Sequence, residues 1–104
     1  MSGDLDGLMA RIWLRYHDEA LERVALVERA AAALARGCAD RALLEAARSA
    51  AHRLAGALGV FGSPEGSACA SRLEVLLSGD PDPATVIRLA AELRASVPAP
   101  GPAG

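Results

Sequence analysis

Apolar residues recur three, four or seven positions apart over most of this chain of 104 residues. This spacing places them on one face of an α-helix. Alanine, leucine and arginine, which favour helices, dominate the composition, whereas β-branched residues are few. The pattern therefore predicts an all-α fold. The longest stripe falls within residues 5–35 and comprises Ile12, Tyr16, Ala20, Val24, Val27, Ala31 and Leu34.

This N-terminal segment is long for a domain of this size. Residues 5–35 would span about 46 Å as one unbroken helix, at about 1.5 Å per residue. Gly37 is placed to end the helix as a C-cap. Because the later segments are too short to cover that length, either the helix breaks between Arg15 and Ala20, or its N-terminal part extends beyond the rest of the fold. The sequence leaves both possibilities open.

Three shorter segments carry helix start signals. Asp40 is an expected N-cap of a second helix, which ends in the turn around residues 59–62. Ser63 and Asp82 are each followed by proline, which is typical of the first position of a helix, so they begin a third and a fourth helix. Short connections between long amphipathic helices favour an antiparallel up-down four-helix bundle with a long N-terminal helix. The expected buried stripes are Leu43, Ala47, Leu54 and Leu58; Cys69, Leu73 and Leu76; and Val86, Leu89 (or Ala90), Leu93 and Val97.

Length, charge and hydropathy narrow the class of protein. We expect one domain over residues 1–97, followed by a flexible tail or linker start rich in proline, glycine and alanine at residues 98–104. The net charge of −2, with both signs interspersed, gives no positive field for nucleic acid. No apolar run approaches the roughly 18 residues of a membrane span, and signal-peptide features are absent. We therefore expect a cytoplasmic monomer that binds neither nucleic acid nor membrane.

Metal and enzyme sites are difficult to assemble from these residues. Two cysteines and two histidines could nominally hold zinc, but their spacing fits no compact metal motif. We expect reduced, mostly buried thiols and a surface position for the first histidine. No Ser-His-Asp or Cys-His arrangement is recognisable, and the glycines of residues 56–62 end a helix instead of forming a phosphate loop after a strand. The chain is thus expected to be neither a self-contained enzyme nor a holder of metal or cofactor. The two cysteines and two histidines considered as zinc ligands are Cys38, Cys69, His17 and His52.

One of these histidines stands apart from the predicted core. At about 100° per residue, His52 lies about 160° from Leu54 and about 140° from Ala47, so it points away from the buried stripe. Glycines follow it four and ten positions later, at Gly56 and Gly62. Glycine inside a helix costs about 1 kcal/mol relative to alanine, which suggests that Gly56 allows the close approach of a partner. An exposed histidine on a bare helix is placed to meet another macromolecule.

The run from His52 to Gly56, together with Gly62, resembles the histidine phosphotransfer (HPt) domain of two-component signalling. The family pattern is a histidine, any residue, an aliphatic residue, usually a lysine, and a glycine, with a second glycine six positions further on. Leu54 fits the aliphatic position, whereas Ala55 stands where the lysine is usual.

Two further features resemble, within this family, the phosphotransfer domains of chemotaxis-type kinases most closely. The turn ends in Val60-Phe61-Gly62, and Glu74 lies 22 residues after His52, where those domains carry a glutamate. They often have a second histidine at the position of Ser71.

The resemblance implies a phosphoryl-group carrier that is reversibly phosphorylated on His52. It would exchange the group with an aspartate of a receiver domain or accept it from a kinase catalytic domain. Imidazole is a nitrogen nucleophile near pH 7, and an acceptor on its other nitrogen fixes the tautomer. Glu74, at the edge of the apolar stripe of its helix, is the expected acceptor. The Mg²⁺ that assists transfer is expected on the partner.

Positive charge near the histidine would stabilise a phosphoryl group, and Ala55 supplies none. Arg48 lies one helical turn before His52 on the same face and is the candidate stabiliser, whereas Arg53 diverges by about 100°. The expected partner-binding residues are Ser49, Arg53, Ala55, Gly56 and Gly59.

A second interpretation remains open because of the missing lysine at Ala55. A non-phosphorylated helical adaptor or dimerisation module could use the same face to bind a receiver or kinase domain. A lone histidine on a polar helical face is usually only a solvated residue, but Gly56, Gly62 and Glu74 in register with it favour the carrier.

Overall fold

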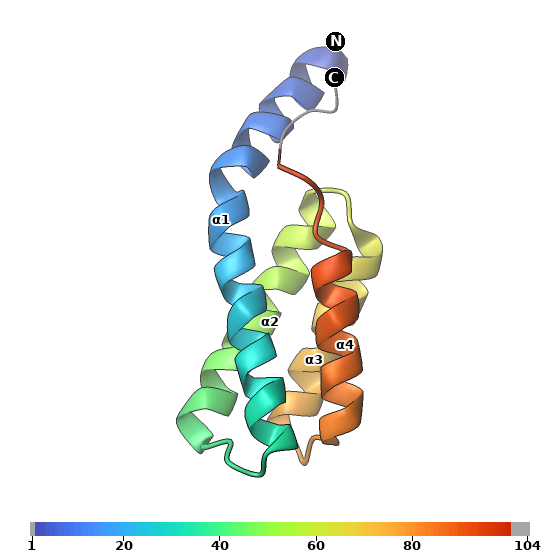
Figure 1. Cartoon of the computed structure of the whole chain (residues 1–104). Coiled ribbons are helices and arrows are strands. Elements are labelled where there is room, and N and C mark those ends of the chain that lie inside the picture. The colour runs from blue at the N-terminus through green and yellow to red at the C-terminus, as the bar shows by residue number, and fades with distance from the viewer. Residues whose placement is uncertain (1, 101–104) are drawn as a thin grey trace.

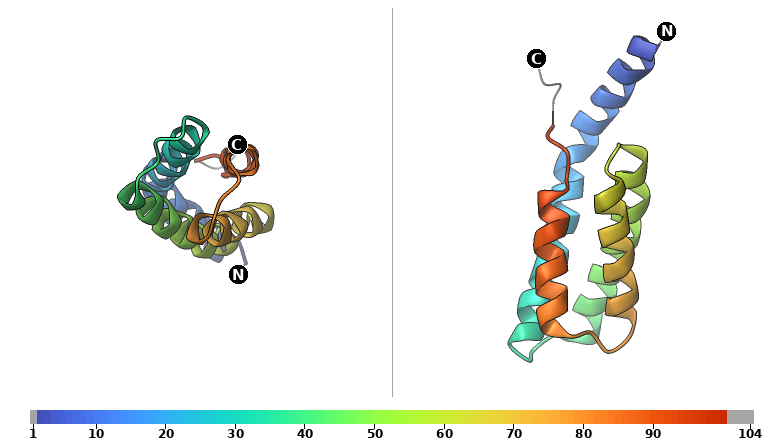
Figure 2. Two further views of the ribbon diagram at one scale, coloured as in Figure 1. Left: turned by 90° about the horizontal axis from the view of Figure 1, so that it is seen from below. Right: turned by 90° about the vertical axis from the view of Figure 1, so that its right-hand side faces the viewer.

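A computed structural model describes residues 2–100 of the chain, with the side chains of residues 5–100. Four helices follow one another: α1 (Ser2–Ala35), α2 (Arg41–Val60), α3 (Pro64–Ser78) and α4 (Pro83–Ala95). Successive helices run antiparallel, and each packs against its two neighbours to form a ring (Figures 1 and 2). The described residues contain no strand. The predicted all-α, up-down four-helix bundle is therefore confirmed.

Side-chain caps begin the last three helices. An oxygen of Asp40, Ser63 or Asp82 accepts a hydrogen bond from the backbone N–H three residues further on, at 2.7, 3.2 and 3.0 Å respectively. Each bond satisfies one of the N–H groups that a helix start leaves without a partner. The three caps confirm the start signals read from the sequence.

Left-handed glycines end the first two helices. Gly37 has a φ of 68° and Gly62 a φ of 87°, values that side chains disfavour. In both turns the N–H of the next residue donates to the carbonyl five positions earlier, at 2.9 Å after Gly37 and 2.8 Å after Gly62. This bond is characteristic of a Schellman motif. Gly62 is thus required by the turn between α2 and α3.

The long first helix is unbroken and extends past the turn between α2 and α3 (Figure 1), so the second of the two open possibilities holds. The molecule is consequently 51 Å long and only 20 by 19 Å across.

Trp13, and not the expected Ile12, is the buried residue of this extension: 5% of Trp13 is exposed, against 42% of Ile12. Beyond the turn only one side of α1 is covered. The Trp13 ring lies 4.9 Å from that of Phe61, and its Nε1 donates to the carbonyls of Pro98 and Ala99 at 3.2 and 3.1 Å. Ile12 faces away from this cover.

The segment after α4 therefore contacts α1 through its first residues. The expected boundary at residue 97 and the flexible character of the tail stay predictions, and residues 101–104 lie outside the described part of the chain.

Two expectations about the cysteines and histidines are wrong. Cys38 is exposed, because it follows the C-cap glycine in the loop between α1 and α2, whereas Cys69 is buried. His17 is not a surface residue: 12% of its side chain is exposed, and its ring packs edge-on against Trp13 at 5.4 Å. Burial raises the pKa of the Cys69 thiol, whose Sγ donates to the carbonyl of Leu89 at 3.1 Å. Cys69 is thus a neutral packing residue.

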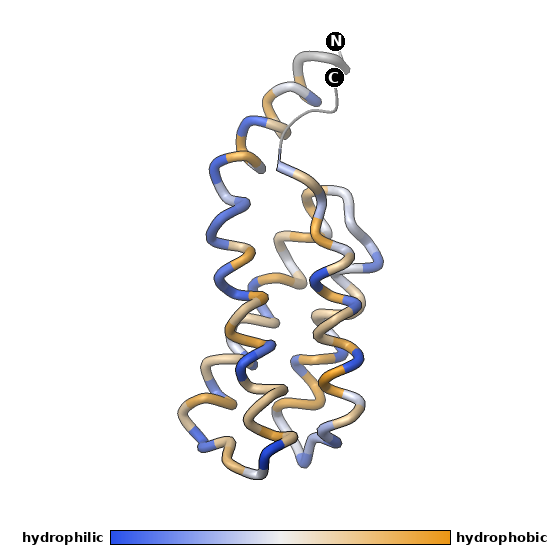
Figure 3. Tube along the Cα trace, in the orientation of Figure 1, coloured by the Kyte–Doolittle hydropathy of each residue, from blue (hydrophilic) through white to orange (hydrophobic). Residues whose placement is uncertain are grey.

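Small and aliphatic residues fill the interior, and polar and apolar positions interchange along every helix in Figure 3, as expected of helices that bury one side. The expected stripes of α2, α3 and α4 are largely confirmed. Leu43, Leu76 and Val97 are only partly buried, however, and α2 additionally buries Ala50 and Ala51.

Gly66 allows α3 to pack closely against α2 and against the end of α4. A Cβ at this position would lie 2.7 Å from Ser63 Oγ, 2.8 Å from Ser96 Oγ and 2.9 Å from Leu58 Cδ1. The Ser63 hydroxyl cannot move away freely, since it donates to the Ser96 carbonyl at 2.8 Å. Gly66 is therefore a packing residue.

We expect Gly66→Ala to lower the free energy of unfolding by about 1–3 kcal/mol, the usual cost of overfilling a packed interior. Gly56→Ala is the matched control, because a Cβ at Gly56 would meet nothing within 4 Å. It should raise the free energy of unfolding by about 0.4–1 kcal/mol through the unfolded chain. Urea denaturation followed by circular dichroism measures both, and changes of the same sign would contradict this assignment.

Candidate functional site

His52 lies on the outer side of α2, in the second half of the helix. The opposite side of α2 buries Ala47, Ala51 and Leu54 in the bundle. As a result, 70% of the His52 side chain is exposed. The ring is therefore accessible to another molecule, as its angular position predicts.

Glu74 of α3 reaches across to this ring. Both of its carboxylate oxygens lie within hydrogen-bonding distance of His52 Nδ1, Oε1 at 3.1 Å and Oε2 at 3.0 Å. Side chains lean toward the N-terminus of their own helix, so on antiparallel helices these two lean toward each other. Only 28% of the Glu74 side chain is exposed, and this partial burial holds the carboxylate at the seam between α2 and α3.

The contact determines which ring nitrogen is available. An ionised carboxylate only accepts hydrogen bonds, so in the neutral ring the proton is on Nδ1, facing Glu74. The lone pair is then on Nε2, which belongs to a largely exposed ring. The pair thus presents one nucleophilic nitrogen outward while the carboxylate holds the other.

Arg48 lies beside this pair, one turn earlier on α2. Its guanidinium is 3.4 Å from Glu45 Oε2 and 3.9 Å from Glu74 Oε2, and 34% of its side chain is exposed. The cation therefore sits at the edge of the site, between two carboxylates. The structure brings together His52, Glu74 and Arg48.

The other expected surface residues divide into two groups. Ser49, Arg53 and Gly56 are exposed on α2 around the histidine. No described group occupies the space at Gly56, since a Cβ there meets nothing within 4 Å, so intramolecular packing does not require this glycine. Ala55 is partly buried and packs against the core. A Cβ at Gly59 would lie 3.4 Å from Ser67 Oγ, so Gly59 faces α3.

Ser67 of α3 also belongs to this region, although nothing in the sequence singles it out. Its hydroxyl donates to the carbonyl of Ala55 at 2.7 Å, one turn after His52. A serine within a helix resembles any solvated position, and the spacing carries no signal for a bond between helices.

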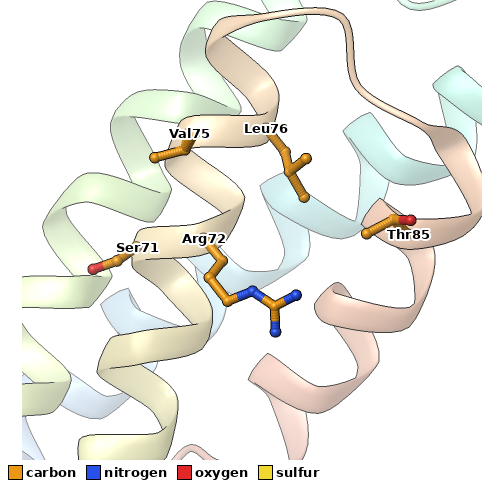
Figure 4. Close-up of a pocket in the computed structure, with 5 residues that line it drawn as sticks. All are labelled: Ser71, Arg72, Val75, Leu76 and Thr85. Atoms are coloured by element: carbon orange, nitrogen blue, oxygen red, sulfur yellow. The ribbon is translucent and has the colours of Figure 1, made fainter.

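A shallow groove lies on the α4 side of α3 and does not include the histidine. It is lined by Ser71, Arg72, Val75, Leu76 and Thr85. Figure 4 shows Ser71 and Arg72 pointing to different sides of α3, with Arg72 and Leu76 directed toward Thr85.

Over the described residues, no group of three or more His, Cys, Asp or Glu side chains could hold a metal ion. Among the same residues, no helix is long and apolar enough to cross a membrane.

Removal of the carboxylate should change the proton position on the ring. In the wild-type chain at neutral pH we expect His52 to be mainly the Nδ1–H tautomer. In Glu74→Ala the Nε2–H form, which imidazole favours in water, should increase. Long-range ¹H–¹⁵N NMR distinguishes the two tautomers. Glu65→Ala, which removes an exposed acid from the same helix, is the control, and a His52 tautomer that is equal in all three proteins would contradict the contact.

Comparison with known families agrees with this geometry. The family model described as the Hpt domain matches residues 11–99, which is most of the chain. No curated protein and no solved structure matches the chain significantly. The matched region includes all of α2, α3 and α4, and thus both members of the histidine–glutamate pair. The chain belongs to the Hpt domain family, the phosphotransfer carriers of two-component signalling.

Proposed function

We propose that this domain carries a phosphoryl group on Nε2 of His52, and that it exchanges the group with a receiver-domain aspartate or accepts it from a kinase domain. The observation that supports this most strongly is the contact of both Glu74 oxygens with Nδ1 of a ring whose side chain is 70% exposed. A solvated surface histidine needs no such partner.

The transfer step follows from the tautomer. The Nε2 lone pair attacks the phosphorus of an aspartyl phosphate, the P–O bond to the aspartate breaks, and the electron pair leaves with the restored carboxylate. The ring then carries a positive charge, because Nδ1 retains its proton. Glu74 lies where it stabilises this charge, in the manner of the acid in a catalytic triad. The reverse step regenerates neutral His52.

The partner completes the site. Phosphoryl transfer depends mainly on positioning and on cations around the phosphoryl oxygens. Beside the histidine this chain offers Arg48, so Mg²⁺ and further charge are expected from the partner. The bare surface at Gly56, with Ser49 and Arg53 next to it, would allow the partner's backbone to come close to the ring.

His52→Gln should abolish phosphorylation without loss of helical structure, because the side chain is mostly exposed. The wild-type and variant chains are incubated with phosphoramidate, a small phosphoryl donor, and separately with a phosphorylated receiver domain. Acid-labile phosphate is then measured on the chain, and circular dichroism controls for folding. Label on the His52→Gln variant would transfer the assignment to His17. Absence of label on the wild-type chain from either donor would favour a non-phosphorylated adaptor.

Arg48→Ala should slow phosphorylation more than Arg53→Ala does, because Arg48 is one turn from His52 on the same face and already lies 3.9 Å from Glu74. In the Arg48→Ala background, Ala55→Lys should partly restore the rate. Ala55 is partly buried, but a lysine stem can lie along apolar surface with its charge in water. Initial rates with the phosphorylated receiver provide the comparison. The opposite order, or no effect of either arginine, would show that the cations come from the partner alone.

A further inference from the structure

We infer that Ser67 is a positioning residue for the histidine: its hydroxyl sets the register of α3 against α2 and thereby holds Glu74 on His52 Nδ1. This inference rests on the proposed function for its kinetic consequence, whereas the geometry of the pair can be measured without phosphorylation.

Hydrogen bonds join α2 and α3 at two places in this region. At one place Ser67 Oγ donates to the Ala55 carbonyl at 2.7 Å, and at the other His52 Nδ1 contacts the two Glu74 oxygens at 3.1 and 3.0 Å. Along α2 they are three residues apart, about 4.5 Å, and along α3 seven residues apart, about 10 Å. The Glu74 side chain closes the difference by leaning back toward the N-terminus of α3. The register of the two helices therefore decides whether the carboxylate reaches the ring.

The Ser67 bond is well suited to fixing that register. Ser67 has a short side chain that is partly buried, and its carbonyl partner belongs to a helix backbone, so the bond tolerates little sliding of α3 along α2. Gly59 lies directly beside Ser67, since a Cβ at Gly59 would be in ordinary contact with Ser67 Oγ at 3.4 Å. The contact of Glu74 with His52 joins two side chains, of which the histidine is 70% exposed, so this contact holds the helices less firmly.

The expected consequence is specific to the ring. Without the Ser67 hydroxyl, α3 should shift or fluctuate along α2, and Glu74 should leave Nδ1 for part of the time. The Nδ1–H tautomer of His52 should then decrease, and so should the rate at which Nε2 accepts a phosphoryl group. The decrease in rate should be about two- to tenfold, the effect of losing one hydrogen bond.

The test compares Ser67→Ala with two other variants. Ser67→Thr keeps the hydroxyl and should behave as the wild-type chain. Ser71→Ala removes a hydroxyl one turn further along α3, at an exposed position, and should also leave the ring unchanged. For each protein, NMR gives the His52 tautomer without phosphate, and phosphoramidate gives the phosphorylation rate without a docking partner.

Ser67→Ala with a lower Nδ1–H share and a slower rate, together with unchanged Ser67→Thr and Ser71→Ala, supports the assignment. A wild-type tautomer in Ser67→Ala overturns it. So does equal impairment of Ser67→Ala and Ser67→Thr, or a Ser67→Ala chain that is no longer helical, because the side chain would then serve packing or folding alone. If the wild-type chain accepts no phosphoryl group, the proposed function fails while the tautomer comparison still decides the role of Ser67.

Discussion

The close packing of α2 against α3 is the constraint on which the rest of this structure depends. These two helices make the most extensive contact in the bundle. Gly66 allows the contact near the start of α3, where a Cβ would lie 2.9 Å from Leu58 Cδ1. A glutamate side chain spans only a few ångströms, so a seam opened by the width of one methyl group would remove the carboxylate from the histidine. The contact between Glu74 and His52 therefore depends on a small residue, Gly66, in the packing of α2 against α3.

A comparison of the two histidines of the chain shows what the packing of α2 against α3 contributes to the site. His17 also has a carboxylate nearby, Asp18 at 3.9 Å, and its ring is packed against Trp13. Its side chain is nearly covered, and its acidic neighbour is fully exposed and adjacent in sequence. His52 has the reverse arrangement, with an open ring and a partly buried acid from another helix. Access for the partner and restraint by the protein are thus combined at one histidine only.

Most of the architecture could be predicted from the sequence, because it depends on local signals. The caps at Asp40 and Ser63 and the left-handed Gly37 act within one turn of the chain, and the stripes of α2 to α4 follow the helical period. The proximity of Glu74 to His52 was also within reach, since a residue at the edge of an apolar stripe lies at a seam.

What could not be predicted depends on contacts between distant segments. The choice of Trp13 over Ile12 depends on Phe61 and residues 98–99, far away in the sequence. The role of Ser67 depends on a backbone carbonyl, which every residue possesses. The exposure of Cys38 depends on the path of the loop between α1 and α2. In each case the residue type was visible, but its surroundings were not.

The hydrogen bonds of Trp13 to the segment after α4 have a practical consequence for spectroscopy. The chain contains one tryptophan, and it is almost completely buried where α1, Phe61 and residues 98–99 meet. Intrinsic fluorescence will therefore report on that end of the molecule, about 13 Å along α2 from His52. Undocking of the C-terminal segment would change the emission while the histidine site remained intact, and events at the histidine would leave the emission unaltered. Tryptophan fluorescence thus reports on the surroundings of Trp13, whereas far-ultraviolet circular dichroism reports on the helix content of the whole bundle.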